Sequence, residues 1–388
     1  MILKYWLETM DKINVENEKD VMFDSIIERH STWLAVNPIQ GCPNDCQYCF
    51  MKRNNMTRVK PHVLLPSGTV IEEIVNSRYY THDVPICYFS KTDIMATKSN
   101  IEYLLDLLEL IYLSDIYNTI VLVTKCYIPT NVIEKLTKLK DSGREVVVYI
   151  SYSGLDSSIE RGIDKRKALS NFYNLKQVGI KIIHYFRPLI PQNSSYEILD
   201  KVIGEVANYS IASVVTGLKV YEELKEVYSF WGDINQIENA SEYECIWSGN
   251  VLDKLKKISR KYNYLIYQSN ACALGYALGE TDRYGIFDSD VCNNFNMCTP
   301  EIREKCKKNN QELSVGEIKS IFEKYGYKNI FFEVDNRTIY IKNYIFTNEE
   351  ICFLSYYLHM KIINVEKADK SSGGYWNNNL NGAEQLYI

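Results

Sequence analysis

The sequence predicts an α/β protein whose largest part is a full or partial barrel of parallel strands and helices. Short runs rich in β-branched residues alternate with stretches of helical periodicity, and most of these runs are apolar along their whole length. Strands that are apolar on both faces are typical of a parallel sheet covered by helices. Six or seven strand–helix units over about 240 residues are enough for a (β/α) barrel, in which functional groups lie at the carboxyl ends of the strands.

The elements of this barrel follow one another along the chain. The candidate strands are Trp33–Ile39, Val84–Ser90, Thr119–Lys125, Glu145–Ser151, Ile180–Arg187, Ser213–Lys219 and Tyr264–Gln268. The candidate helices include Ile101–Leu113, Asn131–Lys140, Lys167–Val178 and Val251–Lys261. Gly143 and Gly179 each stand between a helix and a strand, as expected for a glycine that ends a helix.

The alternation stops at about Ala271, where a segment containing several cysteines begins. After it we expect a helix, two strands and a helix, at Val315–Tyr325, Asn329–Val334, Thr338–Ile341 and Thr347–Met360. Asp335-Asn336 is a plausible hairpin turn between the two strands. We therefore predict an N-terminal extension (1–30), the barrel (31–270), a cysteine-rich segment (271–310) and a small α+β domain (311–388).

Composition excludes some classes of protein. Apolar residues make up 46% and charged residues 24% of the 388 residues, which is ordinary for a soluble globular protein. The net charge of −5 argues against a general nucleic-acid binder. Neither a signal-peptide pattern nor a membrane-length apolar run occurs, so we expect a cytoplasmic protein with no membrane association. Because thiols stay reduced in that compartment, eleven clustered cysteines indicate metal ligation rather than disulfide bonds.

The most informative motif follows the first candidate strand. Cys42, Cys46 and Cys49 form a C-x3-C-x2-C pattern on one short segment. Three thiolates on one loop can bind three irons of a cubane cluster, and the missing fourth ligand leaves one iron open to a small molecule. A zinc site is the alternative, for which His62 is the local candidate as fourth ligand.

The motif, with the aromatic Tyr48 before its third cysteine, resembles the signature of the radical S-adenosylmethionine (SAM) superfamily. The resemblance implies a partial (β/α)6 barrel with a [4Fe–4S] cluster on Cys42, Cys46 and Cys49. It also implies that SAM chelates the open iron and is reductively cleaved to methionine and a 5′-deoxyadenosyl radical, which abstracts hydrogen from a substrate. An electron donor such as a flavodoxin or ferredoxin, and sensitivity to oxygen, are further implications.

The resemblance extends over roughly residues 30–270, where several segments are similar to the branch that contains spore photoproduct lyase-like proteins. These segments are Thr124-Lys125, Ser151-x-Ser153, Leu155-Asp156, Gly179-Ile180 and Arg187-Pro188-Leu189-Ile190-Pro191. Phe89-Ser90-Lys91-Thr92-Asp93 resembles the branch's segment that contacts the SAM amino group, which implicates Ser90, Thr92 and Asp93. Arg161 or Arg166 would correspond to the SAM-contacting arginine of the branch.

Four residues at the carboxyl-end rim of the predicted barrel, called the rim residues, are also expected at a functional site on physical grounds alone. Lys125, Ser151, Ser153 and Arg187 all fall at carboxyl ends of candidate strands, where a barrel carries its functional groups. Because a guanidinium binds a carboxylate through two hydrogen bonds, an arginine here suits the methionine end of SAM. We expect Lys125 and Arg187 to contact SAM or substrate; solvated loop positions or supporting contacts are the alternative for each rim residue. For Asp93 the alternative is a helix N-cap.

A second cysteine group lies beyond the barrel and consists of Cys272, Cys292, Cys298 and Cys306. Four thiolates would satisfy a second [4Fe–4S] cluster or a zinc ion. A partial set of structural or substrate-reactive thiols is the third possibility.

Two functions of different class compete. The first is a radical SAM enzyme acting on a peptide, a small metabolite or a nucleic-acid base. The second is a non-catalytic Fe–S or zinc binding protein, which would hold metal without cleaving SAM.

Overall fold

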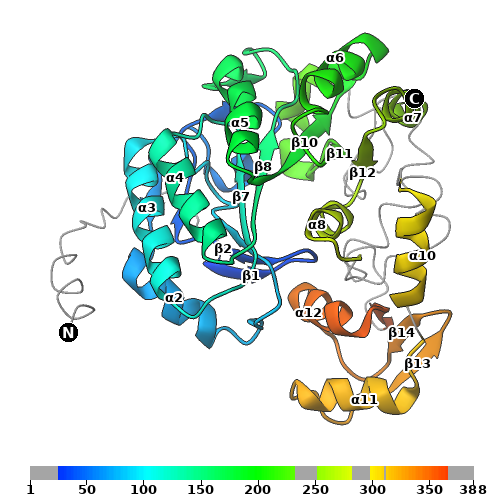
Figure 1. The fold of residues 1–388 in the computed structure, drawn as a ribbon. Helices are drawn as coiled ribbons and strands as arrows, with labels where there is room; N and C mark the ends of the chain where they lie inside the picture. The colour runs from blue at the N-terminus through cyan, green and yellow to red at the C-terminus, as the bar shows by residue number, and fades with distance from the viewer. Residues whose placement is uncertain (1–24, 232–250, 282–297, 310–311, 366–388) are drawn as a thin grey trace. The chain divides into compact units, whose positions relative to one another are not determined.

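A computed structural model describes residues 25–231, 251–281, 298–309 and 312–365, which form two compact units (Figure 1). Among these residues, the first unit comprises 25–28 and Trp33–Ile182, and the second comprises Arg29–Thr32 and the chain from Ile183 onward. Cys292, most of the predicted N-terminal extension and parts of the two C-terminal segments lie outside the described residues.

Parallel strands form the centre of the first unit. These are β2 (Leu34–Val36), β6 (Ile86–Tyr88), β7 (Ile120–Thr124) and β8 (Val146–Ser151). Leu34 pairs with Ile86, Ile86 with Ile120, and Ile120 with Val146. Nearly every residue of these strands is buried, as predicted for strands covered on both faces.

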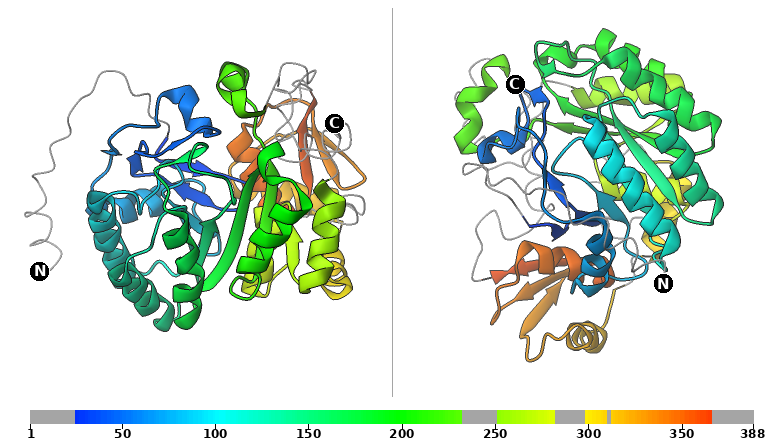
Figure 2. Two further views of the ribbon diagram at one scale, coloured as in Figure 1. Left: turned by 90° about the horizontal axis from the view of Figure 1, so that it is seen from above. Right: turned by 90° about the vertical axis from the view of Figure 1, so that its left-hand side faces the viewer.

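Helices cover these strands on their outer side, as Figures 1 and 2 show from three directions. They are α2 (Ser67–Asn76), α3 (Lys98–Leu113), α4 (Thr130–Asp141) and α5 (Lys165–Gln177). The leucine-rich face of α3 is buried at Leu104, Leu107 and Leu108. Gly143 (φ +92°) and Gly179 (φ +69°) end α4 and α5 in the left-handed conformation, which confirms their prediction as helix ends.

The second unit continues the strand–helix alternation. Its parallel strands are β10 (Lys181–Leu189), which begins in the first unit, β11 (Ala212–Gly217) and β12 (Leu265–Tyr267). The helical elements between them are η2 (Pro191–Asn193), α6 (Tyr196–Val206), η3 (Glu222–Trp231) and α7 (Val251–Tyr262). His184 is buried within β10, where its Nδ1 lies 2.7 Å from Ser213 Oγ.

The strands belong to one sheet in the order β1-β2-β6-β7-β8-β10-β11-β12, with β1 at Ile27–Arg29. In the part of the chain that the structure describes, β1 and β12 are the two ends of this order. The barrel is therefore open, which confirms the predicted α/β class and the partial rather than closed form.

The chain then forms a small α+β region within the second unit. Its elements are α8 (Asn270–Leu278), α10 (Pro300–Asn309), α11 (Val315–Lys324), β13 (Phe332–Asp335), β14 (Thr338–Ile341), α12 (Asn348–Leu358) and β15 (Lys361–Asn364). β13 and β14 form the predicted hairpin, in which Asp335 pairs with Thr338 and Asn336 lies in the turn with φ +43°. β15, which was not predicted, pairs parallel to β14.

Local chemistry explains where the sequence prediction was wrong. The run Trp33–Ile39 is not one strand, because β2 ends at Val36 and β3 (Ile39–Gln40) turns away to pair antiparallel with β5 (His62–Val63). Pro38 has no backbone N–H to donate, so the ladder of hydrogen bonds between neighbouring strands is interrupted there. The helices α2, α6 and α8 were also missed.

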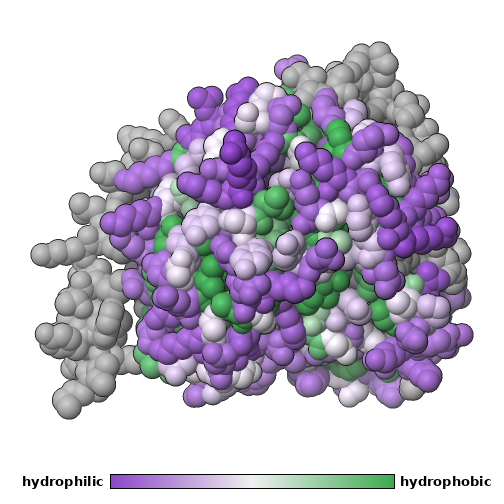
Figure 3. All heavy atoms as spheres, turned by 45° about the horizontal axis from the view of Figure 1, so that its top comes forward, coloured by the Kyte–Doolittle hydropathy of each residue, from purple (hydrophilic) through white to green (hydrophobic). Residues whose placement is uncertain are grey.

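No helix of the described residues combines the length and the apolar character needed to cross a membrane. On the face drawn in Figure 3, hydrophilic residues cover most of the described surface, with smaller apolar areas between them.

Candidate cluster and cofactor site

The C-x3-C-x2-C motif lies on a loop that leaves the sheet after β3. Cys42 forms an isolated bridge with Thr57, Cys46 ends the short strand β4 (Asp45–Cys46), and Cys49 precedes η1 (Phe50–Asn54). Gly41 starts the loop with φ +89°, and a Cβ there would lie 3.0 Å from Val59 Cγ2. Only glycine therefore suits this position without strain.

The three thiols of the loop influence one another electrostatically. The pKa of Cys42 is raised to about 12, chiefly by burial and then by the Asp93 carboxylate and Cys49. The pKa of Cys46 is raised to about 12 by burial, with Glu160 and Cys42 adding to the shift against Lys125. Burial and Cys46 raise the pKa of Cys49 to about 11. These shifts follow mainly from burial, which also raises the pKa of Cys87 in β6.

These thiols do not meet at one point. Among the described residues, no three His, Cys, Asp or Glu side chains are arranged to hold a single metal ion. A cubane cluster makes no such demand, because each thiolate binds a different iron. Three thiolates on one loop are a donor set that fits three irons of a [4Fe–4S] cluster. His62, the candidate zinc ligand, lies in β5 opposite Gln40.

A buried polar cluster lies beside Cys46. Lys125, which follows β7, donates hydrogen bonds from Nζ to Ser151 Oγ (2.6 Å) and to Glu160 Oε1 (2.9 Å). Tyr48 donates to the same Glu160 oxygen, Ser153 also hydrogen bonds to Glu160, and the Lys125 ammonium lies 5.3 Å from the centre of the Tyr48 ring. The structure thus brings four of the predicted site residues together around one carboxylate.

Asp93 organises the neighbouring turn. Its carboxylate accepts hydrogen bonds from Thr124 Oγ1 (2.7 Å) and from the backbone N–H groups of Lys125 (2.8 Å) and Met95 (3.1 Å).

The N-cap alternative for Asp93 is wrong, because α3 begins at Lys98 and Thr97 caps it by accepting from the N–H of Asn100. Asp93 instead joins the segment after β6 to the end of β7.

Polar groups also gather where β2 and β6 end. Asn37 Oδ1 accepts from Ser90 Oγ (3.0 Å) and from the N–H of Lys91 (3.2 Å). Asn37 Nδ2 and Thr92 Oγ1 are buried and have no hydrogen-bond partner among the described residues. A buried polar atom without a partner is costly unless a ligand satisfies it. These two atoms fit a polar ligand such as the amino-acid part of SAM.

The three candidate arginines differ in their surroundings. Arg161 is half exposed and forms an ion pair with Asp45 on the cysteine loop (Nη1–Oδ2, 3.2 Å). Arg166 is exposed in the first turn of α5. Arg187 belongs to the second unit, where it donates to the hydroxyl of Tyr185 and lies 4.9 Å over that ring.

The described members of the second cysteine group belong to two helices and the segment before one of them. Cys272 lies in α8, where it packs against the buried cluster of Ala271 and Tyr356. Cys298 precedes α10, and Cys306 lies within α10. Burial raises the pKa of Tyr267, and Cys298 and then Cys272 raise it further. Cys298 and Cys272 therefore lie close to the same tyrosine.

Two polar residues of the site were missed in the sequence. Glu160 stands in an irregular segment with no periodic pattern, so nothing in the sequence marked it. Asn37 lies at the carboxyl end of a strand, the place where functional groups of a barrel gather, and this signal could have identified it.

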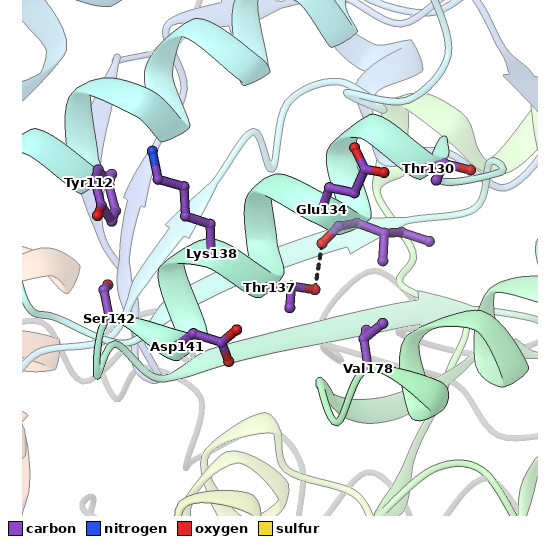
Figure 4. Close-up of a pocket in the computed structure, with 9 residues that line it drawn as sticks. Tyr112, Thr130, Glu134, Thr137, Lys138, Asp141, Ser142 and Val178 are labelled. Carbon is purple, nitrogen blue, oxygen red and sulfur yellow. Dashed lines mark hydrogen bonds between the residues drawn. The ribbon is translucent and has the colours of Figure 1, made fainter.

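A separate surface hollow lies along α4 (Figure 4). Its lining includes Tyr112, Glu134 and Lys138, with Lys138 Nζ 3.8 Å from the Tyr112 ring centre. Thr137 donates a hydrogen bond to the carbonyl of Ile133 within the helix (2.7 Å). None of the predicted site residues lines this hollow.

Comparison with known proteins gives a family match over part of the chain. Residues 36–202, which contain the cysteine loop, β6, β7 and β8, match the model of the radical SAM superfamily. A comparison with curated proteins found no match.

Several solved structures are similar to the chain at low identity. A variant of spore photoproduct lyase is 12% identical with a TM-score of 0.47, covering 67% of this chain and 90% of that one. Streptococcus suis SuiB bound to S-adenosylmethionine is 15% identical with a TM-score of 0.37, covering 54% of this chain and 50% of that one. A radical SAM methyltransferase from Sphaerobacter thermophilus is 11% identical with a TM-score of 0.37, covering 53% and 66%.

Proposed function

We propose that this chain, whose residues 36–202 are a domain of the radical SAM superfamily, is an enzyme that binds a [4Fe–4S] cluster through Cys42, Cys46 and Cys49 and cleaves SAM. The observation that carries the proposal is the placement of three thiols on one loop, with the buried Cys46 beside the polar group of Lys125, Ser151 and Ser153. When bound, the cluster and SAM supply a 5′-deoxyadenosyl radical for hydrogen abstraction from the substrate.

The residues of the chain have distinct tasks in this proposal. The three thiols hold the cluster; Cys46 is buried, and Cys42 and Cys49 are partly buried. Lys125 uses two of its three ammonium N–H groups on Ser151 and Glu160, so the third can bind a carboxylate such as that of SAM. Asn37 and Thr92 offer their unsatisfied amide and hydroxyl groups to polar atoms of the same ligand.

Anaerobic purification followed by reduction in the presence of SAM tests this function. We expect iron and sulfide in the protein, a SAM-dependent change in the EPR signal of the reduced cluster, and formation of 5′-deoxyadenosine. A variant with Cys42, Cys46 and Cys49 all changed to alanine should lose the iron and sulfide of this cluster, the SAM-dependent EPR change and the formation of 5′-deoxyadenosine. Bound metal without 5′-deoxyadenosine in the wild type would favour a non-catalytic Fe–S or zinc protein instead.

The second cysteine group is a further part of the proposed function. Its support is that Cys272 and Cys298, which are distant in sequence, both lie beside Tyr267. Together with Cys306 and Cys292 they would provide the four thiolates of a second [4Fe–4S] cluster. About four irons per chain should remain in the variant that lacks the first three cysteines if this cluster exists. One zinc per chain would instead identify a structural zinc site, and no metal at all would refute a metal site here.

A further inference from the structure

Glu160 is a buried carboxylate that neither the motif nor the rim pattern explains. Its side chain is 4% exposed, and it accepts hydrogen bonds from Lys125, Tyr48 and Ser153. Although burial would raise its pKa, the Lys125 charge and these hydrogen bonds hold the pKa of Glu160 below its usual value. The residue is therefore a fixed negative charge that is paired with one fixed positive charge.

Backbone pairing places this charge against the cysteine loop. Glu160 and Arg161 form the short strand β9, which pairs antiparallel with β4 so that Glu160 is the partner of Cys46. The N–H of Gln47 donates to the carbonyl of Ile159 (2.9 Å), and its Nε2 donates to the carbonyl of Ser158 (2.8 Å). Residues 158–161 thus fasten the segment around Cys46 through backbone and side-chain hydrogen bonds.

The two charges of the pair act on Cys46 in opposite directions. Lys125 favours the thiolate of Cys46, and Glu160 disfavours it. Lys125 is held by Glu160 on one side and by Ser151 on the other, and its side chain is only 18% exposed. Both charges are therefore close to the iron ligand, poorly screened by water and fixed in position.

We propose that Glu160 is a positioning residue that holds Lys125 and Tyr48 beside Cys46, and that the Lys125–Glu160 pair sets the reduction potential of the cluster on Cys42, Cys46 and Cys49. The inference rests on the proposed function, because it needs that cluster. Reduction adds one negative charge to the cluster. A carboxylate beside it opposes reduction and an ammonium favours it, and nearby charge and hydrogen bonding are established determinants of cluster potential.

The test is an anaerobic redox titration of the reconstituted full-length protein, followed by EPR without SAM. Glu160→Gln removes the negative charge and should shift the potential upward. Lys125→Met removes the positive charge and should shift it downward. The double variant should return close to the wild-type value, because the two charges oppose each other. Glu160→Asp keeps the charge and should stay nearer to the wild type than Glu160→Gln.

Glu109 on α3 provides a matched control, since it also forms an ion pair, with Lys135 of α4, and has no hydrogen bond to a cysteine of the described residues. Glu109→Gln should leave the potential unchanged. Equal potentials in the wild type, Glu160→Gln and Glu109→Gln would overturn the inference, as would an equal shift in Glu160→Asp and Glu160→Gln.

If Glu160→Gln does not assemble a cluster, the reduction potential of Lys125→Met tests the inference, and a potential that is not lower than the wild-type value refutes the role of the pair. A wild type without any cluster would instead refute the proposed function itself.

Discussion

The two cysteine groups differ in how the chain brings their members together. The first group is contained within one loop, Cys42 to Cys49, and its middle cysteine is paired through β4 to β9. The second group extends from Cys272 to Cys306; Cys272 and Cys298 lie close to Tyr267, and Cys272 packs against a cluster that joins α8 to α12. Local spacing brings the first group together on one loop, whereas the second group depends on tertiary structure.

This difference predicts how each site responds to change. A site that is built on one loop with its own strand pairing should assemble whenever that loop is intact. A site that is built from separate helices should depend on the packing of the whole region. Changes in the first loop are therefore the sharpest way to test whether spacing alone is sufficient.

The largest effect is expected from Cys46→Ala. Because Cys46 is the buried central cysteine of the loop and a proposed iron ligand, this variant should lose the cluster, and 5′-deoxyadenosine formation should fall to background. Iron analysis and product detection measure both losses.

Cys87→Ala is the matched control, since Cys87 is fully buried in β6 and lies on no proposed site. It should keep the cluster and lose only about 1 kcal/mol of folding free energy. Equal iron loss in both variants would show that the loop cysteines have no special role.

The sequence was sufficient for those parts of the fold that depend on local pattern. The parallel strands β7 and β8 were predicted because they are continuous apolar runs. The helix ends at Gly143 and Gly179 were predicted because a left-handed residue is required there. The hairpin at Asp335-Asn336 was predicted from its turn residues, which favour this conformation.

What could not be predicted depends on pairing between distant segments. Glu160 becomes important only because two-residue strands, β4 and β9, meet across a long stretch of sequence. Asp93 resembled a helix cap, but its carboxylate reaches across to Thr124 and Lys125 on another strand. Such contacts have no periodicity, so no local pattern reveals them.

A smaller effect is expected from Gly41→Ala. The substitution places a side chain at φ +89° and against Val59 Cγ2, so backbone strain and a steric clash add together. We expect a loss of about 2 kcal/mol in unfolding free energy together with reduced cluster content. Chemical denaturation and iron analysis provide the two readouts.

Gly143→Ala separates these contributions, because Gly143 has φ +92° but no atom within 4 Å of an added Cβ. This control should lose about 1 kcal/mol from strain alone and keep its cluster. Full cluster content in Gly41→Ala would contradict the idea that the conformation of the loop start determines cluster assembly.

The smallest expected effect concerns the ion pairs of Asp45. Its carboxylate lies 2.6 Å from Lys52 Nζ and 3.2 Å from Arg161 Nη1, and its side chain is 12% exposed. Burial would raise the pKa of Asp45, but Lys52 and Arg161 outweigh burial and lower it. Because the folded protein then binds this proton more weakly than the unfolded chain does, the pairs stabilise the fold above the usual carboxyl pKa. That stability is lost as the pH falls through the lowered pKa.

Asp45→Asn should therefore reduce the unfolding free energy by about 0.5–1 kcal/mol at neutral pH, the magnitude typical of partly solvated pairs. The difference from the wild type should shrink at an acidic pH well below the usual carboxyl pKa, where the wild-type carboxyl also loses its charge. Urea unfolding at neutral and at acidic pH measures the change.

Asp200→Asn is the matched control in the second unit. Asp200 forms a pair with Lys261 at 2.7 Å that is more exposed, so its loss should reduce the unfolding free energy less. An equal loss for Asp45→Asn at both pH values would mean that its charge does not stabilise the loop, and that hydrogen-bond geometry alone fastens the segment around Cys46.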